Sequence, residues 1–213
     1  MSLINDVLDI SKIQSEDFQL VKFPFDPVET INACVESHRY PAEPKGLQLQ
    51  STIAPDIPAQ LLGDSLRIAQ VINNLLGNAI KFTSNGVILV TVRWEPTSEM
   101  HGRLILQVRD TGVGIDDNKL ESIFERFVQA DDSVSRQFGG SGLGLFITRE
   151  IVSKMDGSIR VESDLGKGST FFVDLNLAIS DVVLHEIHEV NTAGFFGKRA
   201  LVAEDNSVNL LYL

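Results

Sequence analysis

The 213-residue sequence contains a single cysteine, Cys34, and no long apolar run. One cysteine excludes an internal disulfide framework and a cysteine-based zinc site, and it favours a reducing compartment. No stretch approaches the roughly 20 apolar residues that span a bilayer, and none resembles a signal peptide. The sequence therefore predicts a soluble chain in the cytoplasm without membrane contact of its own, which is compatible with a longer, membrane-anchored parent.

Basic residues are also scarce, because 18 Lys and Arg stand against 29 Asp and Glu, for a net charge of −11. Such a chain is a poor partner for nucleic acid, whose phosphates need a basic surface. The apolar share of 43% and the charged share of 22% are those of ordinary globular proteins, so the chain can bury a core. Nucleotides stay open as ligands, since a few local groups suffice to bind them.

Hydrophobic periodicity predicts four helices, at residues 3–14, 28–39, 64–83 and 143–155. Asp64 or Ser65 is expected to cap the third, and Pro41 and Pro44 to end the second. An extended link is expected at 22–27, a strand at 46–53 and a loop at 54–58. Two hairpins are expected, one of strands 87–94 and 103–110 and one of strands 158–163 and 170–177. A short helical island is expected at 119–127 and a final strand at 198–203. This order predicts an α+β fold with a mixed or antiparallel sheet and helices on one face.

The helix expected at 64–83 carries an unusual polar stripe, formed by Arg67, Gln70, Asn74, Asn78 and Lys81. Spacings of three or four residues place all five on one side of the helix, away from its apolar face. The stripe is compatible with a solvated surface, although Asn is a poor helix former. It is equally compatible with two amide oxygens that bind a Mg²⁺ shared with substrate phosphates.

Two glycine-rich segments stand out, one at 112–114 directly after a predicted strand and one at 139–144 directly before a predicted helix. Both are compatible with a turn or hinge that needs conformational freedom. Glycines before a helix also let backbone amides approach a phosphate. The second segment has neither the Walker sequence nor the Rossmann spacing, which argues against those two nucleotide-binding folds.

Four blocks resemble, in order, the catalytic ATP-binding domain of sensor histidine kinases: NNLLGNAIKF at 73–82, DTGVGI at 110–115, IFERFVQ at 123–129 and GGSGLGL at 139–145. They correspond to the asparagine, first glycine, phenylalanine and second glycine boxes of that family. The resemblance implies the two-layer α/β sandwich of the GHKL superfamily (the Bergerat fold), which gyrase and the heat-shock chaperone ATPases share. It also implies an ATP lid at about 116–139 that is mobile without nucleotide.

The flanks resemble other parts of a hybrid histidine kinase. LINDVLDISKI resembles the end of the dimerisation and phosphoacceptor helices, and GKRALVAEDN, with its acidic pair Glu204 and Asp205, resembles the start of a receiver domain. The resemblance therefore implies four parts: a helix end at 1–20, the ATP-binding domain at 21–178, a linker at 179–196 and a truncated receiver at 197–213. It also implies a homodimeric parent whose partners are ATP or ADP, an acceptor-histidine domain and a receiver domain.

On the adenine side, the resemblance assigns Asp110 to the adenine amino group and Phe82 to the neighbourhood of the ring. The remaining positions on this side leave room for the base, anchor the lid or reach the same hydrogen-bond network: Gly112, Gly114, Ile115, Phe124, Phe127, Ser169 and Thr170. For Phe124 and Phe127 a core role is the stronger expectation from spacing alone. A plain turn-to-strand role is equally open for Ser169 and Thr170.

On the phosphate side, the resemblance assigns Mg²⁺ to Asn78 and Asn74, phosphate pairing to Lys81, and the γ-phosphate to Arg136. Backbone amides of the second glycine segment would bind the phosphates, namely those of Gly140, Ser141, Gly142, Leu143 and Gly144. Asn74 stands where gyrase-type ATPases have a glutamate that activates water. An amide cannot act as that base, so Asn74 favours phosphoryl transfer over hydrolysis.

The acceptor histidine of the family is missing, because none of His38, His101, His185 and His188 has its sequence context. The pair His185 and His188 is expected on the surface, since no third metal ligand is near it. The chain is thus predicted to bind ATP with Mg²⁺ weakly and to be inactive by itself, whereas the parent acts on a histidine in a separate domain. Two alternatives remain: a GHKL ATPase or serine kinase, and a nucleotide-binding regulatory module without kinase activity.

Overall fold

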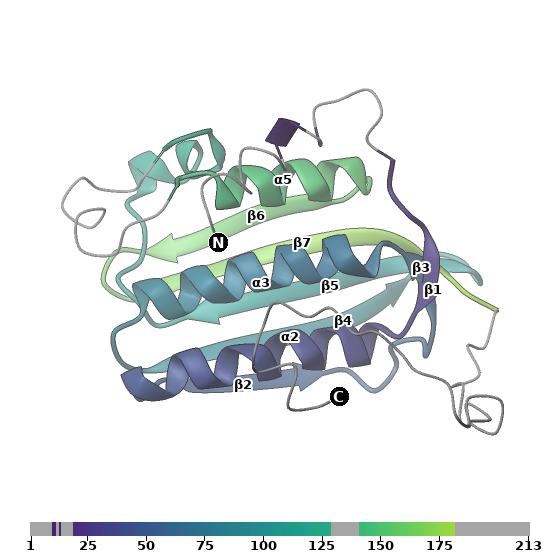
Figure 1. Ribbon diagram of the computed structural model, residues 1–213, viewed down its shortest axis with the longest axis horizontal. Helices are drawn as coiled ribbons and strands as arrows, with labels where there is room; N and C mark the ends of the chain where they lie inside the picture. Colours follow the sequence, from purple (N-terminus) through teal and green to yellow (C-terminus); the bar gives the residue numbers. More distant parts are fainter. Residues whose placement is uncertain (1–9, 12, 14–18, 129–140, 182–213) are drawn as a thin grey trace, which may run out of the picture. The chain divides into compact units, whose positions relative to one another are not determined.

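The structure is a computed structural model that describes residues 10–11, 13, 19–128 and 141–181. These residues belong to the first of two units of the chain, Met1–Val183, while the second unit, Leu184–Leu213, lies outside them. The first unit has two layers, with the helices α2, α3 and α5 on one face of a single sheet (Figure 1). The predicted two-layer α/β sandwich is confirmed.

The sheet has the strand order β1-β3-β7-β5-β4-β2, with β6 beside β7. Its strands are β1 (Phe23–Phe25), β2 (Gln48–Ile53), β3 (Leu61–Gly63), β4 (Val87–Pro96), β5 (His101–Asp110), β6 (Ser158–Asp164) and β7 (Gly168–Ile179). The helices are α2 (Pro27–Ala42), α3 (Ser65–Phe82) and α5 (Gly144–Lys154), with 3₁₀ turns η1 (Glu43–Lys45), η2 (Asp117–Lys119) and η3 (Ser122–Phe124). Only β2 and β4 pair in parallel among these strands, so the sheet is mixed.

Both predicted hairpins are confirmed, and β4–β5 is longer than expected. Pro96 and Gly102, which were expected in its loop, face each other as the last pair of the ladder. The extended link at 22–27 contains β1, which pairs with β3. β3 was not predicted, because three residues are too few to show an alternating pattern.

Two expectations about helices were wrong. α2 does not end before Pro41 but continues through it to Ala42, because a proline in the last turn removes only one hydrogen bond before the helix stops anyway. The island at 119–127 is not one helix but the two turns η2 and η3. Its helical geometry stops at Glu125, which is extended, and Phe127 has a positive φ of 61°.

The core lies between the helices and the sheet. α3 buries one complete face, formed by Ile68, Val71, Ile72, Leu75, Leu76, Ala79 and Ile80. Asp64 caps this helix as predicted: its Oδ1 accepts the Arg67 N–H at 3.1 Å, and its Oδ2 accepts the Val21 N–H at 3.1 Å. Cys34 of α2 packs against α3, where its Sγ lies 3.9 Å from the Ala69 carbonyl oxygen. Cys34 is only 5% exposed, and this burial raises the pKa of its thiol.

The topology brings four chain segments to one end of the sandwich, on the left in Figure 1. They are the end of α3, the end of β5, the turn between β6 and β7, and the start of α5. Of the helix predicted at 3–14, only Ile10, Ser11 and Ile13 are described, and they are helical. The strand predicted at 198–203 lies outside the described residues. No described helix is long and apolar enough to cross a membrane.

Candidate functional site

Asp110 is the last residue of β5 and lies at the end of the sandwich where the four segments meet. It is only 6% exposed, and its Oδ1 accepts the Gly112 N–H at 2.8 Å. Burial raises the pKa of Asp110 above its usual range, whereas the N–H groups of Gly112 and Ser169 and the nearby Thr83 hydroxyl act in the opposite direction. A buried carboxyl here can accept a hydrogen bond from a ligand, at a cost in folding free energy.

Other polar side chains surround Asp110 at a position where the rest of the sheet buries apolar residues. The Thr83 hydroxyl is buried beside the carboxyl, yet it makes no hydrogen bond of ordinary geometry. Ser169 is also buried, and its Oγ lies 2.9 Å from the Oγ of Ser163. Ser163 accepts the Ile115 N–H at 2.8 Å. Since buried polar groups are normally hydrogen-bonded, this cluster is suited to binding a polar ligand or water.

The first glycine segment packs tightly against the end of α3. A Cβ on Gly112 would lie 2.5 Å from the Phe82 carbonyl oxygen, and the Val113 N–H donates to that same oxygen at 3.3 Å. Gly114 has a φ of +69°, and a Cβ there would lie 2.1 Å from the Asp164 carbonyl oxygen. Close backbone approach requires these two glycines, so they do more than permit a flexible turn.

The polar stripe of α3 is not an open solvated face, because all five of its side chains are half-buried. Arg67 Nη1 donates to Gln70 Oε1 at 2.7 Å. Asn74 Nδ2 donates to Thr148 Oγ1 of α5 at 2.7 Å. The Lys81 Nζ lies 4.6 Å from the centroid of the Phe82 ring, and burial lowers the pKa of Lys81. The stripe is therefore partly covered by other protein groups.

The second glycine segment contacts the polar stripe of α3 through Gly144, the first residue of α5. A Cβ on Gly144 would lie 2.4 Å from Asn74 Oδ1, so this glycine permits the contact between α5 and α3. Gly142 has a φ of +69° and accepts the Phe127 N–H at 3.1 Å. Leu143 is fully buried, and its N–H donates to the Oγ of Ser141 at 3.2 Å.

The two phenylalanines of the third block have different environments. Phe124 is buried and meets Phe171 of β7 edge-to-face, with ring centroids 6.5 Å apart. Phe127 is 66% exposed and lies beside Gly142. The expected core role thus fits Phe124, whereas Phe127, which lies within the expected lid, is not part of the core.

The structure brings most of the expected site residues to one end of the sandwich, and Thr170 lies at that end but on the opposite face of the sheet. Thr170 pairs with Arg109 across the sheet and shares the face away from the helices, because successive strand residues point to opposite faces. Its neighbour Ser169 lies beside Asp110 instead. Several expected residues lie outside the described ones, namely Arg136, Gly140, His185, His188, Glu204 and Asp205.

Sequence reasoning missed three polar residues of this end: Thr83, Thr148 and Ser163. Thr148 follows Gly144 by four residues, and its hydroxyl donates to the Gly144 carbonyl at 3.0 Å. Because residues four apart lie on the same face of a helix, this spacing could have predicted that Thr148 lies beside Gly144. Thr83 and Ser163 gave no signal, because their roles depend on how α3 and the β6–β7 hairpin pack around Asp110.

Comparison with known proteins gives consistent results. Residues 63–179 match the family model described as histidine kinase-, DNA gyrase B-, and HSP90-like ATPase. The signal transduction histidine-protein kinase BarA of Escherichia coli (strain K12) is 40% identical over 207 residues, which are 97% of this chain and 22% of BarA. The hybrid signal transduction histidine kinase L of Dictyostelium discoideum is 42% identical over 172 residues, 80% of this chain and 10% of that protein.

A solved structure shows the same fold. The crystal structure of full-length ShkA in complex with AMPPNP has a TM-score of 0.74 and 31% identity, and the match covers 84% of this chain and 36% of that one. The chain thus spans about a fifth of the length of BarA and about a third of ShkA. Because the family model covers more than half of the sequence, the chain belongs to the family of histidine kinase-, DNA gyrase B- and HSP90-like ATPases.

Proposed function

We propose that this chain contains the ATP-binding catalytic domain of a hybrid sensor histidine kinase. In this proposal the catalytic domain comprises residues 21–178, and residues 1–20 are the end of an acceptor-helix domain. Residues 179–196 are a linker, and residues 197–213 are the start of a receiver domain. The observation that carries the proposal is the arrangement around α3. The end of α3 meets the first glycine segment at Phe82, the polar stripe meets the second at Asn74, and a buried carboxyl, Asp110, lies at the same end.

The adenine base would bind at Asp110. Its carboxylate would accept a hydrogen bond from the adenine amino group, and Gly112 and Gly114 would let the neighbouring backbone pack closely beside this carboxylate. The buried Thr83 hydroxyl, which makes no hydrogen bond of ordinary geometry, and the buried Ser169 support a polar ligand at this place. Phe82, with the Lys81 amine over its ring, would lie between the base and the phosphates.

The phosphates and a Mg²⁺ ion would bind along the stripe. Asn74 uses its Nδ2 on Thr148, which leaves Oδ1 for a cation, and Asn78 follows one turn later. Amide oxygens are hard ligands that suit a Mg²⁺ shared with phosphates. Lys81 would pair with a phosphate, while Arg136 and the amides of the second glycine segment would reach the β- and γ-phosphates.

The reaction of the parent would be transfer of the γ-phosphoryl group to a histidine in a separate domain. An imidazole nitrogen would form the new bond to phosphorus as the bond to the bridging oxygen of ADP breaks. Asn74 cannot activate water as a base, which supports transfer over hydrolysis. The phosphoryl group would then pass to a receiver aspartate.

Calorimetric titration of the chain with ADP and with a non-hydrolysable ATP analogue tests the nucleotide site. We expect binding that Mg²⁺ strengthens and that Asp110→Asn abolishes. A folded chain that binds neither nucleotide would favour a regulatory module, and steady phosphate release without an added domain would favour an ATPase. Phosphate transfer from ATP to an added acceptor-histidine domain of the parent would complete the test.

Location and assembly are part of the same proposal. A domain that consumes ATP is expected on the cytoplasmic side of a cell, and the paired acceptor helices of this kinase class would make the parent a homodimer. Fractionation of the parent and light scattering with and without residues 1–20 would test these two points.

A further inference from the structure

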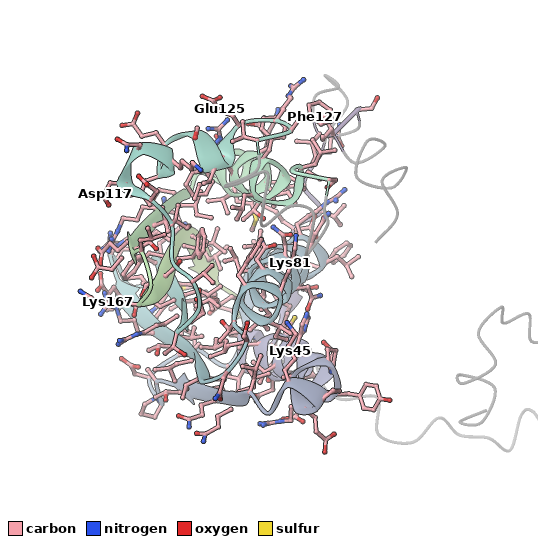
Figure 2. All side chains as sticks on the ribbon, turned by 90° about the vertical axis from the view of Figure 1, so that its left-hand side faces the viewer. Lys45, Lys81, Asp117, Glu125, Phe127 and Lys167 are labelled. Atoms are coloured by element: carbon pink, nitrogen blue, oxygen red, sulfur yellow. The ribbon has the colours of Figure 1, made fainter. Side chains whose placement is uncertain are left out.

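We infer that Lys45, which belongs to none of the four blocks, is a positioning residue for the phosphate-binding end of α3. This inference rests on the proposed function, because it concerns the same site. Lys45 lies in η1, 36 residues before Lys81, yet its amine reaches the end of α3. Figure 2 looks at this end of the molecule and labels both lysines on its helical side.

The last carbonyl groups of α3 have no partners within the helix, as in every helix, and other groups must satisfy them. The Ala79 carbonyl accepts the Thr83 N–H at 3.0 Å, and the Phe82 carbonyl accepts the Val113 N–H at 3.3 Å. Lys45 satisfies the two carbonyls between them: its Nζ donates to the Ile80 oxygen at 2.7 Å and to the Lys81 oxygen at 3.3 Å.

The backbone of Lys45 is itself held in place by the end of η1. Gly46 has a left-handed φ of 64°, and its N–H donates to the Glu43 carbonyl at 2.9 Å. The next N–H, that of Leu47, donates to the Ala42 carbonyl at 3.3 Å. These two bonds form a Schellman motif with Lys45 at its C-cap, so the side chain starts from a fixed point.

Lys45 acts on the site by position and by charge. The turn of α3 that it holds carries Asn78 and Lys81, which are proposed to bind Mg²⁺ and a phosphate. The C-terminal end of a helix also carries a partial negative charge, which repels phosphates. An ammonium group bonded to these carbonyls offsets that charge, so Lys45 is expected to favour phosphate binding without touching the nucleotide.

The test compares the affinities of the whole chain for ADP with Mg²⁺ and for adenosine. Lys45→Met keeps the length of the side chain but removes its charge and its donors. We expect it to weaken ADP binding by about two- to fivefold, the range for one charge at a helix end, and to leave adenosine binding unchanged. Lys45→Arg, which restores charge and donors, should recover most of the ADP affinity.

Lys22→Met is the matched control, because it removes the same charge from an exposed position before β1. It should change neither affinity, and circular dichroism should show that all variants are folded. Equal weakening of ADP and adenosine by Lys45→Met would show a merely structural role and overturn the inference, as would unchanged ADP affinity. A wild-type chain that binds no nucleotide would instead overturn the proposed function, and this inference with it.

Discussion

Asp110 is a residue whose burial favours ligand binding and opposes folding at the same time. Its carboxyl is held at the edge of the core, with the Gly112 N–H as its nearest donor at 2.8 Å. Burial raises its pKa, which means that the folded protein disfavours the charged form. Because the buried carboxylate of Asp110 lowers the stability of the fold, ligand binding explains its presence better than stability does.

Asp110→Asn is therefore expected to stabilise the folded chain at neutral pH while removing the adenine contact. In wild type, the folded state binds a proton more readily than the unfolded state between the ordinary value of 3.8 and the raised pKa of Asp110. The free energy of unfolding consequently falls as the pH rises from 3.8 to the raised pKa of Asp110. Above that pKa, the folded protein carries the full cost of a buried charged carboxylate. Urea unfolding of both proteins from pH 4 to pH 8 should show the advantage of the variant shrinking as pH falls. Parallel curves would contradict this.

Phe127 is the second residue with an evident cost, because a non-glycine residue with a φ of 61° is strained. Phe127→Gly should relieve that strain and stabilise the chain by roughly 0.5–1 kcal/mol, since the exposed ring contributes little burial. Phe127→Ala keeps the strain and should show no gain, which makes it the control. Thermal unfolding of the three proteins measures the difference, and a loss of stability in the glycine variant would show that the ring packs on something essential.

At the level of elements, α3 is fixed at both ends and also approached along its length. Asp64 caps its start, Lys45 and Val113 satisfy its last carbonyls, and α5 contacts it through Asn74. A helix held in this way keeps its polar stripe in one orientation before any ligand arrives. Pre-ordering of this kind lowers the entropy cost of binding.

Two glycine-to-alanine changes separate the site role of this arrangement from helix stability. Gly144→Ala places a methyl group 2.4 Å from Asn74 Oδ1, so it should displace Asn74 and weaken Mg²⁺-dependent nucleotide binding by about tenfold or more. Gly77→Ala in α3 meets nothing within 4 Å. It should raise the free energy of unfolding by up to about 1 kcal/mol, because alanine is the better helix former. Calorimetry and urea unfolding of both variants test the contrast, which fails if Gly144→Ala binds like wild type.

How much of each element could be predicted depended on the source of its signal. α3 was predictable from end to end, because its cap, its apolar face and its polar stripe all lie within one stretch of sequence. Which of Ser169 and Thr170 lies beside Asp110 could not be predicted, since it depends on the register of β7 against β5. The passage of α2 through Pro41 was missed because proline ends helices in general but is tolerated in a last turn.

At the level of the whole described unit, β7 connects the parts of the sheet. One of its edges pairs with β5 over nearly its full length, and its other edge pairs first with β6 and then with β3. Segments from the beginning and the end of the unit thus depend on one another. Folding of such an arrangement is expected to be cooperative.

A shorter chain limited to residues 63–179, the part that matches the family model, is accordingly expected not to fold. It would lack α2, β1, β2 and most of β3 and would expose the surface of α3 against which α2 packs, where Cys34 lies beside Ala69. A chain of residues 19–181 retains all the strands and the three long helices that the structure describes, and it should unfold in one transition. Urea unfolding followed by fluorescence of Trp94 and by circular dichroism distinguishes the two, and a cooperative transition in the shorter chain would refute the expectation.

The burial of Cys34 between α2 and α3 has a practical consequence for measuring motion in this protein. As the only cysteine of the sequence, it is the only group that a thiol reagent can label. At 5% exposure and with its pKa raised, it is expected to react slowly in the folded chain, through the groove between α2 and α3 that it lines with Ala33 and Ala69. The labelling rate of the unmodified chain therefore reports how accessible this groove is, and slower labelling with a bound nucleotide would show that the ligand restrains α2 and α3 from a distance.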